Sequence, residues 1–166
     1  MCARQLSKLD EFRYCFTDSK VDLVCVTETW LNSSVSDSTV AVDGYCLLRN
    51  DRKSSRGGGI CLYHKSNIDC KIIDSSDSGT GYENDDRTEY LFVDIRVNNT
   101  KFFLEVIYSP PDSDCSELIN EKLSELSLQY GKIVLVGDFN TNLKKKKNMP
   151  KQVGFVISWT VLGYSV

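Results

Sequence analysis

Short apolar runs rich in β-branched and aromatic residues recur along most of the chain, and charged or glycine-rich turns separate them. Runs of this length and composition are typical of β-strands. The first of them predicts a buried strand, because its residues are almost all apolar. The predicted strands cover residues 21–27, 45–48, 60–64, 68–73, 89–97, 101–107 and 132–136.

Two segments show helical periodicity instead. Apolar residues at helical spacing predict an amphipathic helix over about residues 5–18. Asp114 and Glu117 resemble a capping box at the start of a second helix, predicted over about residues 114–130. Many strands with a few interspersed helices predict an α/β or α+β domain with two sheets.

Composition limits the class of protein further. With 166 residues, 41% of them hydrophobic and 26% charged, the chain suits one ordinary globular domain rather than a disordered or collagen-like protein. No apolar stretch approaches the roughly 20 residues of a membrane-spanning helix. The Met1 end has no apolar segment typical of a secretory signal, so we expect an intracellular protein, nuclear or cytoplasmic. Nothing in the sequence implies an oligomer.

Charge is distributed unevenly along the chain, whose net charge is −3. Residues 144–166 contain five lysines and no acidic residue, whereas residues 1–143 are acidic overall. An acidic body argues mildly against nucleic-acid binding and equally suits carboxylates gathered around a cation. We predict a domain over residues 1–143. The tail over residues 144–166 is either a pair of terminal strands or lies outside the domain.

The chain has seven cysteines and no Cys-x-x-Cys pair. An odd number without paired spacing predicts free thiols rather than disulfides or a zinc site. Cys25, Cys46 and Cys61 lie inside apolar runs, so we expect them to be buried.

Polar side chains follow three of the predicted strands directly. Glu28 follows the first strand, Tyr108 follows the run that ends at Ile107, and Asp138 and Asn140 follow the last. Two carboxylates, an amide and a phenol at the ends of strands suit a hard cation such as Mg²⁺ acting on a phosphate. The alternative is that each of these residues only caps a turn.

Five motifs in this order are similar to the endonuclease/exonuclease/phosphatase family. The chain most resembles the apurinic-type endonuclease domain of non-LTR retrotransposons, and the resemblance spans roughly residues 3–143. The motifs are Val-Thr-Glu-Thr-Trp-Leu at 26–31, Asp-Gly-Tyr at 43–45, Arg-Gly-Gly-Gly at 56–59, Ile-Tyr-Ser-Pro-Pro at 107–111 and Gly-Asp-Phe-Asn at 137–140.

The resemblance implies a four-layer α-β-β-α sandwich, the DNase I-like fold, in incomplete form. It implies that Glu28 binds Mg²⁺, with Mn²⁺ as a substitute, and that Asp138 orients or deprotonates the attacking water. Asn140 is expected to hydrogen-bond the phosphate and Tyr108 to support it. Arg56 is a weaker candidate for substrate binding. The implied activity is nicking of DNA.

The chain also departs from the family pattern at both ends. The first strand of the family and its asparagine are not found, and Cys2 stands at the corresponding position. The closing Asp-His pair is not found either, and the one histidine, His64, lies within a predicted strand. Two alternatives therefore stay open. One is an inactive, truncated remnant that at most binds a partner, and the other is a phosphoesterase of the same fold that acts on inositol phosphates or lipids.

Four basic side chains lie close together between two of the predicted strands. They are Arg49, Arg52, Lys53 and Arg56. The cluster either contacts a nucleic-acid backbone or forms a solvated loop.

Overall fold

A computed structural model gives the fold of the chain. It describes residues 3–16, 20–53, 57–76, 88–111, 113, 115–126, 128–140 and 153–156. None of the helices in this part of the chain has both the length and the apolar composition needed to cross a membrane.

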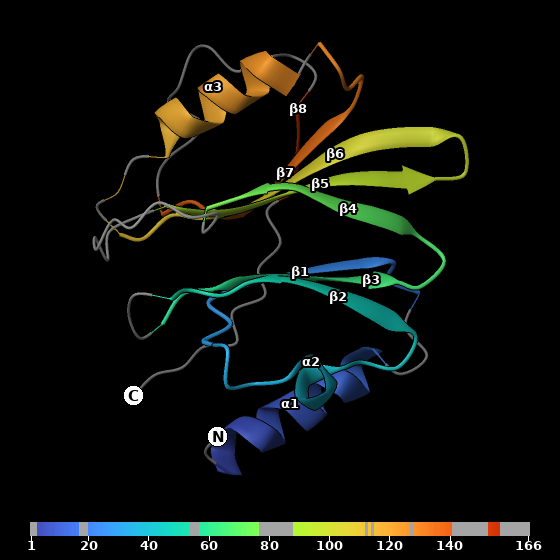
Figure 1. The fold of residues 1–166 in the computed structure, drawn as a ribbon, viewed down its shortest axis with the longest axis vertical. Helices are drawn as coiled ribbons and strands as arrows, with labels where there is room; N and C mark the ends of the chain where they lie inside the picture. Colours follow the sequence, from blue (N-terminus) through green and yellow to red (C-terminus); the bar gives the residue numbers. More distant parts are fainter. Residues whose placement is uncertain are drawn as a thin grey trace.

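Two β-sheets lie face to face (Figure 1). The smaller sheet is antiparallel and has the order β1-β3-β2, with β1 at Leu23–Thr27, β2 at Tyr45–Asn50 and β3 at Ile60–Lys65. The larger sheet is mixed and has the order β4-β5-β6-β7-β8. Its strands are β4 at Asp69–Ser75, β5 at Glu89–Val97, β6 at Thr100–Tyr108, β7 at Ile133–Asp138 and β8 at Val153–Val156.

Helices cover the outer faces of both sheets (Figure 1). Helix α1, Ala3–Phe16, and the short α2, Asp37–Val40, lie on the side of the smaller sheet. Helix α3, Ser116–Leu126, lies on the larger sheet and connects β6 to β7, which are parallel. A parallel pair needs such a crossover, because a tight turn can only join antiparallel strands.

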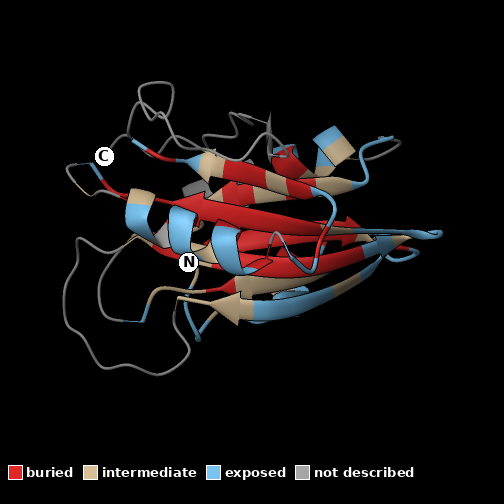
Figure 2. Ribbon diagram, turned by 90° about the horizontal axis from the view of Figure 1, so that it is seen from above, coloured by how far each residue is buried: buried red, intermediate tan, exposed pale blue. Residues whose placement is uncertain are grey.

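Three apolar clusters fill the three spaces between these layers. Phe12 of α1 packs with Val24 and Tyr63 on the outer face of the smaller sheet. The middle cluster lies between the sheets and includes Leu62 and Val93. The third joins α3 to the larger sheet and includes Phe92, Phe103, Ile119, Leu123 and Leu135. Figure 2 shows the buried residues concentrated in the strands. The layer order α-β-β-α follows from these clusters.

Most predicted elements lie within a few residues of the observed ones, and the differences have physical causes. The run at 21–27 is not buried throughout: its burial alternates along β1, because β1 is an edge strand. Cys46 is exposed rather than buried, since β2 is the other edge of the same sheet, whereas Cys61 on the central strand is buried. The helix predicted over 114–130 is shorter, and residues 128–129 form a turn.

The division into residues 1–143 and 144–166 stays a prediction. Residues 153–156 form β8, which pairs in parallel with β7.

Candidate active site

The carboxyl ends of β1, β6 and β7 bring three of the predicted site residues together. Tyr108 and Asp138 are the last residues of β6 and β7, and they are partners in the parallel register of these strands. Glu28 follows β1 in the other sheet. The Tyr108 hydroxyl donates to Glu28 Oε1 at 2.5 Å, so this hydrogen bond joins the two sheets. The structure thus places these three residues at the same end of the two sheets.

Asn140 closes a turn beside Asp138. Its backbone N–H donates to Asp138 Oδ1 at 3.2 Å, and its side-chain Nδ2 donates to the Ser109 carbonyl oxygen at 2.8 Å. The Ser109 N–H donates in turn to the Asp138 carbonyl oxygen at 2.8 Å. The two bonds that involve Ser109 connect the ends of β6 and β7, and together with the bond inside the turn they hold Asp138 and Asn140 in place at the surface.

Backbone strain marks the same region. Glu28, Trp30 and Asn140 have positive φ angles of 54°, 56° and 41°. Asparagine tolerates the left-handed region, but glutamate and tryptophan adopt it rarely and at a cost of about 1–3 kcal/mol. Strain of this kind persists where the surrounding structure enforces it, and it clusters at functional sites.

The glycines just before β3 supply the partners that hold this strained segment. The Thr29 N–H donates to the Gly59 carbonyl oxygen at 3.2 Å, and the Trp30 N–H donates to the Gly58 carbonyl oxygen at 2.8 Å. The two hydrogen bonds fix the backbone directly after Glu28, so the direction of its carboxylate toward Tyr108 does not depend on β1 alone.

Gly137 is required for the position of Asp138. Its φ is 141°, and a Cβ atom added there would lie 1.8 Å from the Ile107 carbonyl oxygen. Any side chain would therefore push β7 away from β6 one residue before Asp138.

Tyr108 is held in the protonated, donating form. Its side chain is 7% exposed, and burial raises the pKa of the phenol well above its ordinary value. The hydrogen bond to Glu28 raises this pKa further, while the charge of Arg52 opposes the change. A neutral phenol can donate to a carboxylate without adding negative charge near a phosphate.

Arg52 and Glu89 lie beside Tyr108; the sequence placed Arg52 only in the basic cluster, and it gave Glu89 no role at the site. Arg52 Nε donates to Glu89 Oε1, and the Gly59 N–H donates to Glu89 Oε2 at 2.7 Å. The guanidinium carbon of Arg52 lies 6.0 Å from the centroid of the Tyr108 ring. The one sequence signal for Glu89 was an acidic residue at the start of an apolar strand. Such a residue usually marks only the end of a turn.

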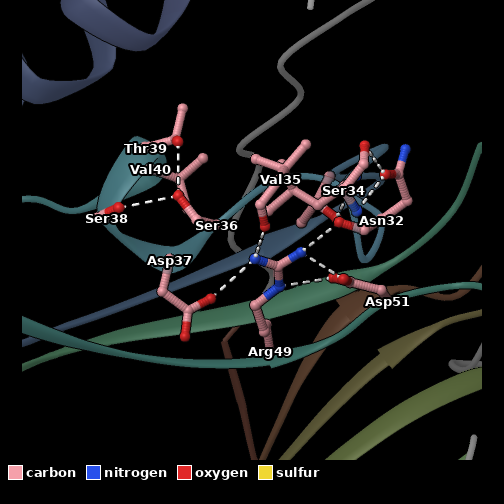
Figure 3. Close-up of polar contacts among 12 residues, drawn as sticks. Asn32, Ser34, Val35, Ser36, Asp37, Ser38, Thr39, Val40, Arg49 and Asp51 are labelled. Carbon is pink, nitrogen blue, oxygen red and sulfur yellow. Dashed lines mark hydrogen bonds and ion pairs between the residues drawn. The ribbon is translucent and has the colours of Figure 1, made fainter.

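Two members of the predicted basic cluster, Arg49 and Arg52, form ion pairs with carboxylates of the fold. The Arg49 guanidinium forms ion pairs with Asp51 and Asp37, and it donates to the carbonyl oxygens of Val35 and Asn32 (Figure 3). The hydrogen bond to Asp51 raises the pKa of Arg49. Arg49 and Arg52 are both held in ion pairs, so neither is a solvated loop side chain, and contact of the cluster with a nucleic-acid backbone stays a prediction. Arg56 lies outside the described residues.

The donor set around Glu28 fits Mg²⁺. No group of three or more histidine, cysteine, aspartate or glutamate side chains is arranged to hold a metal in the described ranges. Mg²⁺ does not need a cluster of three protein side chains. It keeps several waters and often takes only one or two protein carboxylates plus phosphate oxygens. Glu28 Oε2 and Asp138 Oδ2 accept no hydrogen bond from the residues that the structure describes.

His64 is not part of this site. It pairs in register with Leu23, whereas the site follows Thr27, at the opposite end of β1. The histidine is buried, and its Nδ1 lies 3.1 Å from the Lys65 carbonyl oxygen. Its position in β3 agrees with the non-catalytic role expected from the sequence.

Solved structures share this fold at low sequence identity. TDP2 from Caenorhabditis elegans is 14% identical, with a TM-score of 0.61 over 90% of this chain and 47% of that one. The human Nocturnin catalytic domain with a bound sulfate is 12% identical, with a TM-score of 0.54 over 85% of this chain and 58% of that one. TDP2 from D. rerio, complexed with a single-strand DNA product, is 14% identical, with a TM-score of 0.52 over 84% of this chain and 55% of that one.

The chain thus spans about half the length of these structures. No curated protein matches it by sequence. The model of the Endonuclease/Exonuclease/phosphatase family matches residues 4–151. Since that match includes Glu28, Tyr108, Asp138 and Asn140, which the fold brings to one end of the two sheets, the chain belongs to the Endonuclease/Exonuclease/phosphatase family.

Proposed function

We propose that the chain is a Mg²⁺-dependent phosphodiesterase that nicks DNA, derived from a non-LTR retrotransposon. The observation that carries the proposal is the Tyr108–Glu28 hydrogen bond across the two sheets, with Asp138 as the register partner of Tyr108. Members of the family generally use Mg²⁺. The motifs around Glu28 and Tyr108 favour the retrotransposon branch.

Each side chain then has a distinct task. Glu28 would hold Mg²⁺ through Oε2, while its Oε1 is kept in place by Tyr108. Mg²⁺, when bound, acts as a Lewis acid on the phosphate. Asp138 would orient the attacking water and accept its proton through Oδ2. The amide of Asn140 has a second N–H, beyond the one donated to Ser109, with which it can hold a phosphate oxygen.

DNA is the substrate that we favour over a phosphoinositide or a lipid headgroup. TDP2 from D. rerio has been solved with a single-strand DNA product, and this chain shares its fold. The acidic body of the chain fits this substrate only if bound cations screen the phosphates, as Mg²⁺ held by Glu28 would. We therefore expect binding to depend strongly on the divalent ion.

A second candidate is a DNA-binding module without catalysis. It is favoured by the position of the single histidine, His64, which lies in β3 and away from Glu28 and Asp138. A site without an acid to protonate the leaving group loses much of its rate but not its affinity for phosphate.

Nicking of supercoiled plasmid tests the proposal. The wild-type chain should nick in Mg²⁺ and not in EDTA, and Glu28→Gln and Asp138→Asn should each lower the rate by about 100-fold or more. Asp43→Asn, in the exposed turn before β2, is the matched carboxylate control and should nick as the wild type does. Plasmid binding without nicking would favour the second candidate. Release of phosphate from a phosphoinositide, but not nicking, would overturn DNA as the substrate.

A further inference from the structure

Glu89 lies beside the site and is hydrogen-bonded to Arg52 and to the backbone of Gly59. It is the first residue of β5, its side chain is buried, and its backbone is the antiparallel register partner of Tyr108 on β6. A buried carboxylate is stable only when its oxygens are paired, and both oxygens of Glu89 are.

One oxygen of Glu89 acts on Tyr108 through Arg52. Arg52 Nε donates to Oε1, and this ion pair places the guanidinium 6.0 Å from the centroid of the Tyr108 ring. A cation at that distance from an aromatic face is attracted to it. The ion pair therefore restrains the ring whose hydroxyl donates to Glu28.

The other oxygen of Glu89 acts on the backbone beside Glu28. The Gly59 N–H donates to Oε2 at 2.7 Å, and the carbonyl oxygen of the same glycine accepts the Thr29 N–H at 3.2 Å. The space is tight: a Cβ atom on Gly58 would lie 2.4 Å from Arg52 Nε and 2.6 Å from Glu89 Oε1. The glycines are therefore needed for the loop to reach Glu89.

We propose that Glu89 is a positioning residue of the metal site, because its carboxylate fixes the Tyr108 ring and the backbone beside Glu28 together. It binds neither metal nor substrate, and it acts by setting the geometry in which the glutamate and the phenol meet. This inference rests on the proposed function, since it assigns a role toward the ion that Glu28 would hold. Residues that orient metal ligands change metal affinity or activity by about 10–100-fold when they are replaced.

The test measures Mn²⁺ affinity by calorimetric titration, and then kcat and KM for plasmid nicking. Glu89→Gln should weaken Mn²⁺ binding by about 10-fold and lower kcat by about 10–100-fold, with little change in KM. Arg52→Gln should have a smaller effect of the same kind. Because Glu89 acts partly through Arg52, the double variant should lose less than the two single variants combined.

Asp51→Asn is the matched control. It breaks the Arg49–Asp51 ion pair, whose members lie close to Arg52 in the chain and bond to each other rather than to the Glu89 carboxylate. It should lower the melting temperature as Glu89→Gln does while leaving Mn²⁺ affinity and kcat unchanged. If Glu89→Gln matches Asp51→Asn in all three measurements, Glu89 is only structural and the inference is overturned. If the wild type neither binds Mn²⁺ nor nicks, the proposed function fails instead.

Discussion

Glu105 makes the stability of the protein depend on pH near neutrality. It lies in the middle of β6, between Phe92 on β5 and Leu135 on β7, and its side chain is 0% exposed. Neither carboxyl oxygen has a hydrogen-bond partner in the described part of the molecule. Burial raises the pKa of Glu105 from 4.5 to about 7, and the charge of Lys122 on α3 opposes this increase only in part.

The sign of the effect follows from which state binds the proton. Between pH 4.5 and 7 the folded protein keeps Glu105 protonated, whereas the unfolded chain has released that proton. Ionisation therefore stabilises the unfolded state as pH rises through this range, and the free energy of unfolding falls until about pH 7 and then levels. A difference of about 2.5 pKa units corresponds to about 3 kcal/mol, since one unit is about 1.36 kcal/mol.

Urea unfolding of the wild type and Glu105→Gln between about pH 4 and about pH 8 measures this contribution. The glutamine variant keeps the shape of the side chain but cannot ionise, and all other titrating groups are common to both proteins. We expect the free energy of unfolding of the variant, relative to the wild type, to rise by about 3 kcal/mol across this range. Glu121→Gln, at an exposed position of α3, is the matched control for the loss of a carboxylate. A difference that stays constant with pH for Glu105→Gln would refute the reasoning.

Three further substitutions test the geometry of the site and its surroundings. Gly137→Ala should lower the free energy of unfolding by about 2–4 kcal/mol in urea titrations, because its Cβ would overlap the Ile107 carbonyl oxygen; an unchanged midpoint would contradict the close approach. Tyr108→Phe should lower the free energy of unfolding by only about 1 kcal/mol but weaken Mn²⁺ binding about 10-fold in calorimetry, because Glu28 loses its hydrogen-bond donor. Identical Mn²⁺ binding isotherms for the wild type and the variant would contradict this role. Arg49→Gln should lower the free energy of unfolding by about 2–3 kcal/mol, because its ion pairs are broken, and leave plasmid nicking intact. A loss of nicking without a loss of stability would show that Arg49 binds the substrate instead.

The ends of strands could be predicted because their signals are local. An apolar run followed closely by a polar residue predicted Glu28, Tyr108 and Asp138 as candidate site residues. The parallel pairing of β6 with β7 places Tyr108 and Asp138 side by side. The four-layer order followed from the family resemblance, and the three apolar clusters agree with it.

Features that depend on the position of a strand in its sheet could not be predicted in this way. The exposure of Cys46 and the alternating burial along β1 both result from the positions of β2 and β1 at the edges of their sheet. No local sequence pattern reveals such a position. The Arg52–Glu89 ion pair joins residues 37 positions apart, one just after β2 in the smaller sheet and the other at the start of β5 in the larger sheet. Glu105 lies within an apolar run, and only the packing of α3 over β6 shows that its carboxyl group is buried.

The position of a bound Mn²⁺ ion tests the central claim most directly. Anomalous scattering from crystals grown with Mn²⁺ should show a single peak at about 2.1–2.2 Å from a carboxylate oxygen of Glu28, beside Asp138 and on the open side of the Tyr108 hydrogen bond. The same peak should vanish in Glu28→Gln. A peak elsewhere in the molecule, or one that persists in Glu28→Gln, would contradict the assignment of Glu28 as the metal-binding residue.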